Sequence, residues 1–113
     1  MYKVVVVEDE TMARKGIILT IDWSALGCVV VGEAANGEEG AALVARLAPD
    51  IVVTDVKMPR MDGVEMITKL RAEGCTAKFI ILTAYSDFKY AQSALRLGVS
   101  DYCLLYTSDA ADE

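Results

Sequence analysis

The sequence contains no histidine. This absence excludes Ser-His and Cys-His catalysis and histidine-ligated metal sites on this chain, so any metal ion must be held by oxygen ligands. Cysteine is scarce too. Cys28, Cys75 and Cys103 are far apart, odd in number and without a metal-binding spacing, which predicts small reduced core residues in a cytoplasmic protein.

Long apolar runs are also absent. No run approaches the ~20 residues that a membrane helix needs, and acidic residues follow the short run in MYKVVVVEDE, which predicts a first strand and no signal peptide. Basic residues are outnumbered by acidic ones, 11 to 17. The net charge of −6 argues against nucleic-acid binding by this segment, because a surface that follows phosphates needs a basic patch.

Strand and helix patterns alternate through the 113 residues. Strands are predicted at 2–8, 28–34, 51–54, 78–84 and 100–105. Helices are predicted at 11–21, about 37–47, 63 or 64 to 73, and 86–98, with cap-like residues at Thr11, at Asn36 with Glu39, and at Asp62 with Glu65. This order predicts one α/β domain with a doubly wound parallel sheet.

Acidic residues follow two of the predicted strands. Glu8, Asp9 and Glu10 come at the end of the first strand, and Asp55 comes at the end of the third. Ligands of an open parallel sheet bind beyond the carboxyl ends of its strands, so these acids converge if the two strands are neighbours. Two like charges about 4 Å apart repel by roughly 4 kcal/mol at an effective dielectric near 20. Carboxylates with no histidine and no nearby arginine therefore favour a hard divalent cation, and Mg²⁺ fits best.

Asp55 has the position of a nucleophile, with a rigid strand before it and a loop after it. A carboxylate can attack phosphorus to form an aspartyl phosphate when a metal neutralises the phosphoryl oxygens. Thr83, at the end of the fourth strand, can then hydrogen-bond the phosphoryl group. The alternative is that the acids only occupy exposed strand ends or cap helices. That explanation is sufficient for residues 8–10 taken alone. The position of Asp55 at the end of another strand argues against it.

Three stretches carry a resemblance to a known family: VVVVEDE, IVVTDVKMPRMDG and ILTAYSDFKYAQSALRLGVSDY. On them the chain resembles, over residues 2–102, the receiver domain of two-component response regulators. The stretches IDWSALGCVVVGEAANGEEG and AYSDFKYAQSALRLG look most like regulators with an AraC-type helix-turn-helix output domain. The resemblance implies a flavodoxin-like fold with five strands in the order 2-1-3-4-5.

The resemblance also implies a role for each matching position of the acidic site. Asp55 resembles the phosphoacceptor, and Asp9 resembles the acid that binds Mg²⁺ directly. Glu8 matches the acid that is usually linked to the metal through water. The main-chain carbonyl of Lys57, two residues after the acceptor, would complete the protein ligands.

Two further positions resemble the switch of the family. Thr83 matches the hydroxyl that moves toward the phosphoryl group, and Tyr102 matches the aromatic partner on the fifth strand. In the family a sensor histidine kinase donates the phosphoryl group. The resulting shift between two conformations alters dimerisation or contacts with an output domain, which would be a DNA-binding domain absent from this chain.

The sequence departs from the family pattern after residue 102. Where a Lys-Pro pair and a final amphipathic helix are expected, the chain has Leu105, Tyr106 and the short polar tail TSDAADE. We therefore divide the chain into a receiver domain, 1–102, and an atypical tail, 103–113. Either the receiver is naturally divergent or foreign sequence is joined to a truncated receiver, and we favour the second.

Two other functions stay open at this point. A pseudo-receiver, which would bind partners without phosphorylation, is compatible with the missing lysine. An aspartyl-phosphate phosphatase of the haloacid dehalogenase type would need a second acid two positions after the nucleophile, where this chain has Lys57. We expect a phosphoacceptor signalling domain and not an enzyme with an external substrate.

Overall fold

The computed structural model describes residues 1–83 and 101–104, and for Thr83 and 101–104 the description covers the backbone alone. Its helices and strands are β1 (Tyr2–Val7), α1 (Thr11–Thr20), the 3-10 turn η1 (Ser24–Leu26), β2 (Cys28–Ala34), α2 (Gly37–Leu47), β3 (Ile51–Thr54), α3 (Gly63–Ala72), β4 (Lys78–Thr83) and β5 (Asp101–Leu104).

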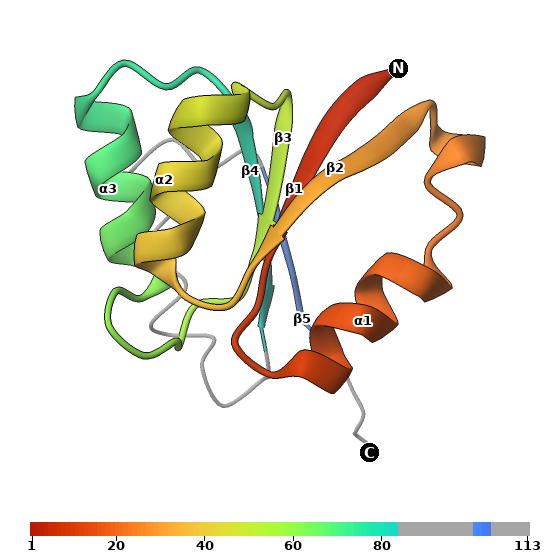
Figure 1. The fold of residues 1–113 in the computed structure, drawn as a ribbon, viewed down its shortest axis with the longest axis horizontal. Coiled ribbons are helices and arrows are strands. Elements are labelled where there is room, and N and C mark those ends of the chain that lie inside the picture. The colour runs from red at the N-terminus through yellow and green to blue at the C-terminus, as the bar shows by residue number, and fades with distance from the viewer. Residues whose placement is uncertain (84–100, 105–113) are drawn as a thin grey trace.

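The strands form one parallel sheet in the order β2-β1-β3-β4-β5. This is the flavodoxin-like order, and it places β1 directly beside β3, as the convergence of the acids requires. Figure 1 shows α2 and α3 side by side on one face of the sheet and α1 on the other. The described part of the chain is therefore a three-layer α/β domain.

The four valines of β1 explain why the sheet is covered on both faces. Successive side chains of a strand point to opposite faces. Val5 and Val7 lie in the core under α2 and α3, whereas Val4 and Val6 lie in the core under α1. All four are at most 1% exposed, and burying each stabilises the fold by about 1.5–3 kcal/mol. A continuous β-branched run is thus the signature of a central strand.

Two of the three predicted helix starts are confirmed. The Asn36 side chain accepts a hydrogen bond from the Glu39 amide, and Asp62 forms a complete capping box with Glu65. The cap predicted at Thr11 is wrong, because α1 begins at that residue. The residue before it, Glu10, holds the N-cap position. Its backbone is extended, and its side chain makes no capping hydrogen bond.

Most predicted boundaries agree within one residue, although β1 ends at Val7 and leaves the next residue outside the strand.

Cys28 is buried, Cys75 is partly buried, and both are free thiols. Among the described residues, no helix is both long and apolar enough to cross a bilayer. The helix predicted at 86–98 and the tail after residue 104 lie outside the described residues.

The left-handed backbone conformation of Ala48, at the end of α2, can be tested by substitution. Ala48 caps this helix in the left-handed conformation, at φ 47°, where a Cβ atom is unfavourable and glycine is not. Ala48→Gly is therefore expected to raise the free energy of unfolding by about 0.5–1 kcal/mol in urea denaturation. The matched control is Ala42→Gly, an exposed site inside the same helix, which should lower it by about 1 kcal/mol. Equal losses for both variants would contradict the assignment.

Candidate functional site

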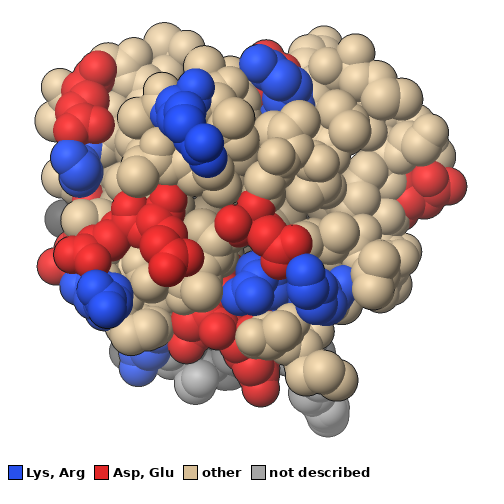
Figure 2. Space-filling view, viewed as in Figure 1, with Lys and Arg blue, Asp and Glu red and all other residues tan. Residues whose placement is uncertain are grey.

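Three carboxylates lie together beyond the carboxyl ends of β1 and β3. One carboxylate oxygen from each of Glu8, Asp9 and Asp55 lies within 4.8 Å of the other two. The cause is the register of the sheet, in which Val7 pairs with Thr54, so that the next residues of both strands leave at the same level. Figure 2 shows acidic side chains gathered over this part of the molecule, with basic side chains beside them.

Main-chain hydrogen bonds fix Asp55 at the end of β3. Its amide donates to the Val7 carbonyl at 3.0 Å, which continues the β1–β3 ladder by one residue. Its carboxylate oxygen Oδ1 accepts from the Val56 amide at 2.7 Å, and its carbonyl accepts from the Thr54 hydroxyl at 2.8 Å. The side chain is half-buried, so a rigid strand presents a carboxylate that solvent can still reach.

Two glycines let the loop after Asp55 pack against that strand end. A Cβ on Gly63 would lie 2.3 Å from the Asp55 carbonyl oxygen, and the Gly63 amide donates to the Val56 carbonyl at 2.7 Å. A Cβ on Gly37 would lie 2.1 Å from the Met61 carbonyl oxygen, which accepts from the Gly37 amide. Both approaches exclude any side chain at these positions. The Asp-Gly pair of the sequence is therefore a helix cap followed by a required close contact.

Glu8 is the buried member of the cluster, at 4% exposure. The pKa of Glu8 is raised from 4.5 to about 8, chiefly by burial; the hydrogen bond from the Glu10 amide opposes this rise, and the charge of Asp55 and hydrogen bonds with Asp9 and Asp55 add to it. That amide donates to Oε2 of Glu8 at 3.1 Å. Without a cation, the cluster thus relieves its repulsion by keeping one carboxyl protonated.

The profile of the response regulator receiver domain matches residues 4–104 of this chain. The chain belongs to this family. Among solved structures, the chain is similar to the REC domain of AraT, a response regulator from Geobacillus stearothermophilus. The TM-score is 0.85 at 40% identity, covering 91% of this chain and 80% of that one.

Two curated transcriptional regulators are also similar to this receiver domain. YesN of Bacillus subtilis, an uncharacterized transcriptional regulatory protein, is 40% identical over 104 residues, which are 92% of this chain and 28% of YesN. HptR of Staphylococcus aureus is 34% identical over 104 residues, which are 92% of this chain and 40% of HptR. The chain thus spans less than half of either relative.

The structure brings some predicted site residues of the receiver domain together and leaves others undescribed. Lys57 lines a shallow hollow of about 420 Å³ with Asp9, Met58, Pro59 and Asp62, so this residue lies beside one of the three acids. Thr83 ends β4 and Tyr102 lies in β5, where it pairs with Ile81. The side chains of both predicted switch residues lie outside the described part of the chain.

The prediction that no arginine lies near the acids is wrong. Arg14 stands on the first turns of α1, and its Nη1 donates to the Glu8 carbonyl at 2.8 Å. The sequence signal was available, because a helix that starts at residue 11 brings position 14 back toward the loop before it. The tertiary contact itself depends on how α1 packs on β1, which the sequence pattern leaves open.

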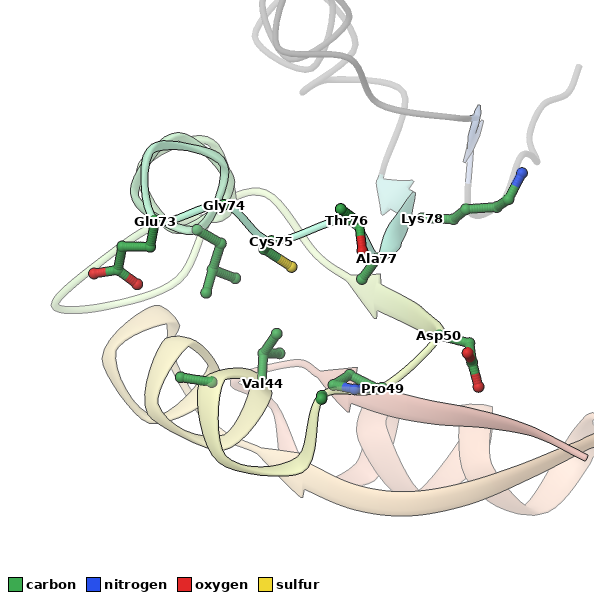
Figure 3. Close-up of a pocket in the computed structure, with 12 residues that line it drawn as sticks. Val44, Pro49, Asp50, Glu73, Gly74, Cys75, Thr76, Ala77 and Lys78 are labelled. Carbon is green, nitrogen blue, oxygen red and sulfur yellow. The ribbon is translucent and has the colours of Figure 1, made fainter.

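A second hollow, of about 550 Å³, lies at the opposite ends of the strands (Figure 3). It lies between the last turns of α2 and α3 and the starts of β3 and β4, and Val44 and Cys75 point into it from the two sides (Figure 3). Asp50 and Glu73 also line it. The three-carboxylate cluster is not there, so the chemistry expected of this domain belongs to the other edge of the sheet.

The raised pKa of Glu8 predicts a pH dependence of stability in the metal-free receiver domain. A carboxyl whose pKa rises from 4.5 to about 8 on folding stabilises fully below pH 4.5, and this contribution is lost as the pH rises through about 8. Urea denaturation in EDTA should show the free energy of unfolding falling between pH 5 and pH 8, by as much as a few kcal/mol. Glu8→Gln should remove this fall, and an unchanged slope in the variant would contradict the assignment.

The close contact at Gly63 predicts a second result. Gly63→Ala forces the start of α3 away from the Asp55 carbonyl and is expected to lower the free energy of unfolding by about 1–3 kcal/mol. The control is Gly16→Ala inside α1, where a Cβ meets nothing within 4 Å and helix propensity should add about 0.5–1 kcal/mol. Urea denaturation measures both, and a tolerated Gly63→Ala would show that the loop does not depend on this contact.

Proposed function

We propose that this receiver domain accepts a phosphoryl group on Asp55 with Mg²⁺ as its cofactor, and that it acts as a signalling switch without turnover of an external substrate. The supporting observation is the set of three carboxylate oxygens within 4.8 Å of one another, one of them from Asp55 at the end of β3. A nucleophilic carboxylate beside a cation-binding pair of acids is what phosphoryl transfer to an aspartate needs.

The donor set suits Mg²⁺. This ion takes oxygen ligands at about 2.0–2.1 Å, so two ligands on opposite sides of it lie roughly 4.2 Å apart. The three carboxylate oxygens all lie within 4.8 Å of one another, so a single ion can be held by all three, directly or through a water molecule. We assign Asp9, Asp55 and the Lys57 carbonyl to direct contact and the buried Glu8 to contact through water.

The reaction proposed for Asp55 is a transfer between two covalent partners. A carboxylate oxygen attacks phosphorus while the P–N bond of a phosphohistidine on a sensor histidine kinase breaks, and the histidine nitrogen leaves with the bonding electron pair. The product is an acyl phosphate on Asp55. Bound Mg²⁺ would neutralise the negative charge of the phosphoryl oxygens. The main-chain bonds to Asp55 hold its carboxylate in place for attack.

The response is proposed to pass through Thr83 and Tyr102. In the sheet register Thr54 pairs with Ile81, so the end of β4 at Thr83 lies at the same edge as Asp55, and β5 continues the sheet from there. The partners proposed are the kinase, an output domain of AraC-type DNA-binding class, and a second receiver in a homodimer. YesN and HptR are both described as transcriptional regulatory proteins and are both more than twice as long as the matched region, which supports an output domain beyond this chain.

The receiver domain is proposed to end near residue 102, followed by the tail 103–113. The family match ends at residue 104, next to the point where the expected Lys-Pro pair is replaced by Leu105 and Tyr106. Leucine carries no charge for a phosphoryl oxygen. We therefore separate acceptance of the phosphoryl group, for which the acids are present, from the response, which in this chain lacks the lysine.

Phosphorylation by a small donor tests the acceptor. With Mg²⁺ and acetyl phosphate, intact-mass measurement should show one phosphoryl adduct on the 113-residue protein, and Asp55→Asn should abolish it. The control is Asp50→Asn at the other end of β3, where Oδ2 accepts from the Lys3 amide; this variant should keep the adduct. A folded wild-type protein that forms no adduct would instead indicate a phosphorylation-independent pseudo-receiver, and steady phosphate release from unrelated phosphoesters would indicate a phosphatase.

A further inference from the structure

Arg14 joins the loop that carries two of the acids to the neighbouring edge strand. Its Nη1 donates to the main-chain carbonyl of Glu8 at 2.8 Å, and its Nε donates to Oε1 of Glu33 on β2 at 2.7 Å. Only 13% of the Arg14 side chain is exposed. The planar guanidinium can donate in two fixed directions at once, which suits a bridge between a carbonyl and a carboxylate.

The Glu8 peptide groups are held from both sides. The Glu8 amide donates to the carbonyl of Ala34 at 3.0 Å, while the Glu8 carbonyl accepts from Arg14. Ala34 and Glu33 are consecutive residues at the end of β2, so both restraints lead to the same strand end. The Glu8 carbonyl belongs to the peptide bond that leads to Asp9. Fixing it therefore limits the direction in which the exposed Asp9 side chain leaves the backbone.

Lys15 provides a natural comparison for this arrangement. Its Nζ also binds Glu33, at 2.9 and 3.1 Å, but half of its side chain is exposed, and its hydrogen bonds within the described residues go to Glu33 and not to the loop of residues 8–10. Hydrogen bonds from Lys15, which has the larger effect, and from Arg14 both lower the pKa of Glu33. Figure 2 shows basic side chains beside acidic ones over the start of α1 and the end of β2. The two residues thus share a partner and differ in the contact with Glu8.

We propose that Arg14 is a positioning residue of the acidic site, which holds the Glu8–Asp9 peptide so that the Asp9 carboxylate faces Asp55. This inference rests on the proposed binding of Mg²⁺ at that site. Two carboxylates about 4 Å apart repel by roughly 4 kcal/mol at an effective dielectric near 20. An exposed Asp9 on an unrestrained loop would turn away to relieve that repulsion. The bridge to β2 opposes this movement and prepares the site for the cation.

Affinity for Mg²⁺ tests the inference. Isothermal titration of the metal-free 113-residue protein with Mg²⁺ should show binding weakened about 10–100-fold in Arg14→Met, the size of effect seen when groups that orient metal ligands are removed. Lys15→Met, which removes the neighbouring cation from the same partner, should bind within about twofold of wild type, since an exposed ion pair contributes little. Arg14→Lys keeps the charge and should recover only part of the loss.

Labelling kinetics distinguish the proposed positioning role of Arg14 from a general contribution to the stability of the fold. In acetyl phosphate labelling, Arg14→Met should raise the Mg²⁺ concentration that gives half the maximal rate, while the rate at saturating Mg²⁺ returns to within about twofold of wild type. General destabilisation would lower the fraction of folded protein at every Mg²⁺ concentration. If Arg14→Met does not fold, Arg14→Lys carries the same comparison. Wild-type affinity in Arg14→Met, or equal losses in Arg14→Met and Lys15→Met, would overturn the inference.

Amide hydrogen exchange in EDTA tests the restraint of the loop by Arg14 without any bound metal, so its outcome does not depend on the proposed function. Arg14→Met should speed exchange at residues 9 and 10 about tenfold, and Lys15→Met should not, since, of these two cations, it is Arg14 that bonds to the Glu8 carbonyl. Unchanged exchange would overturn the inference whatever the Mg²⁺ affinity of the wild-type protein. A wild-type protein that binds no Mg²⁺ but shows the expected exchange would instead reject the proposed cofactor and retain the positioning role.

Discussion

The pairing of β1 with β3 is the constraint on which the acidic site depends. Their register places Val7 opposite Thr54, so Glu8 and Asp55 leave the sheet at the same level and three carboxylates gather within 4.8 Å. Such a cluster opposes folding by several kcal/mol of repulsion. The valines of β1 and β3 are buried on both faces of the sheet and supply more than this amount. The site is held together by hydrophobic burial beneath it.

Around that centre, the short-range contacts all limit the movement of the acids. The Val56 amide holds the Asp55 carboxylate, the Glu10 amide holds Glu8, and Gly63 lets α3 begin against the Asp55 carbonyl. The burial of Glu8 raises its pKa to about 8, so a proton can occupy the place of a cation near neutral pH. Proton and metal then compete for one group, and metal affinity should depend on pH.

Acceptance of a phosphoryl group and the response to it involve different parts of the chain. The proposed acceptor and metal ligands lie on the loops after β1 and β3, all within the described residues. The proposed response depends on Thr83, Tyr102 and the segment after them, where Leu105 stands in place of the lysine that the family pattern predicts. This division means that a chain can keep the chemistry of the acidic site while the signal it produces is altered.

The local features and the order of the elements follow from sequence patterns alone. Valine runs indicate central strands because they suit burial on both faces, and the Asn36 and Asp62 caps follow from side chains that reach amides three residues away. The convergence of Glu8, Asp9 and Asp55 was predictable once β1 and β3 were taken as neighbours. The false cap at Thr11 shows the limit of such patterns, since a cap also depends on the backbone before it.

The burial of Glu8 and the partners of Arg14 depend instead on how distant segments pack together. Arg14 reaches Glu33 across 19 residues of sequence, and the β1–β2 register shifts between Val4 and Val5, so no periodicity in the sequence predicts which side chains meet there. Burial likewise depends on every element packed around a group. Local pattern fixes what a residue can do, whereas packing between distant segments fixes which charge it meets and how much water remains beside it.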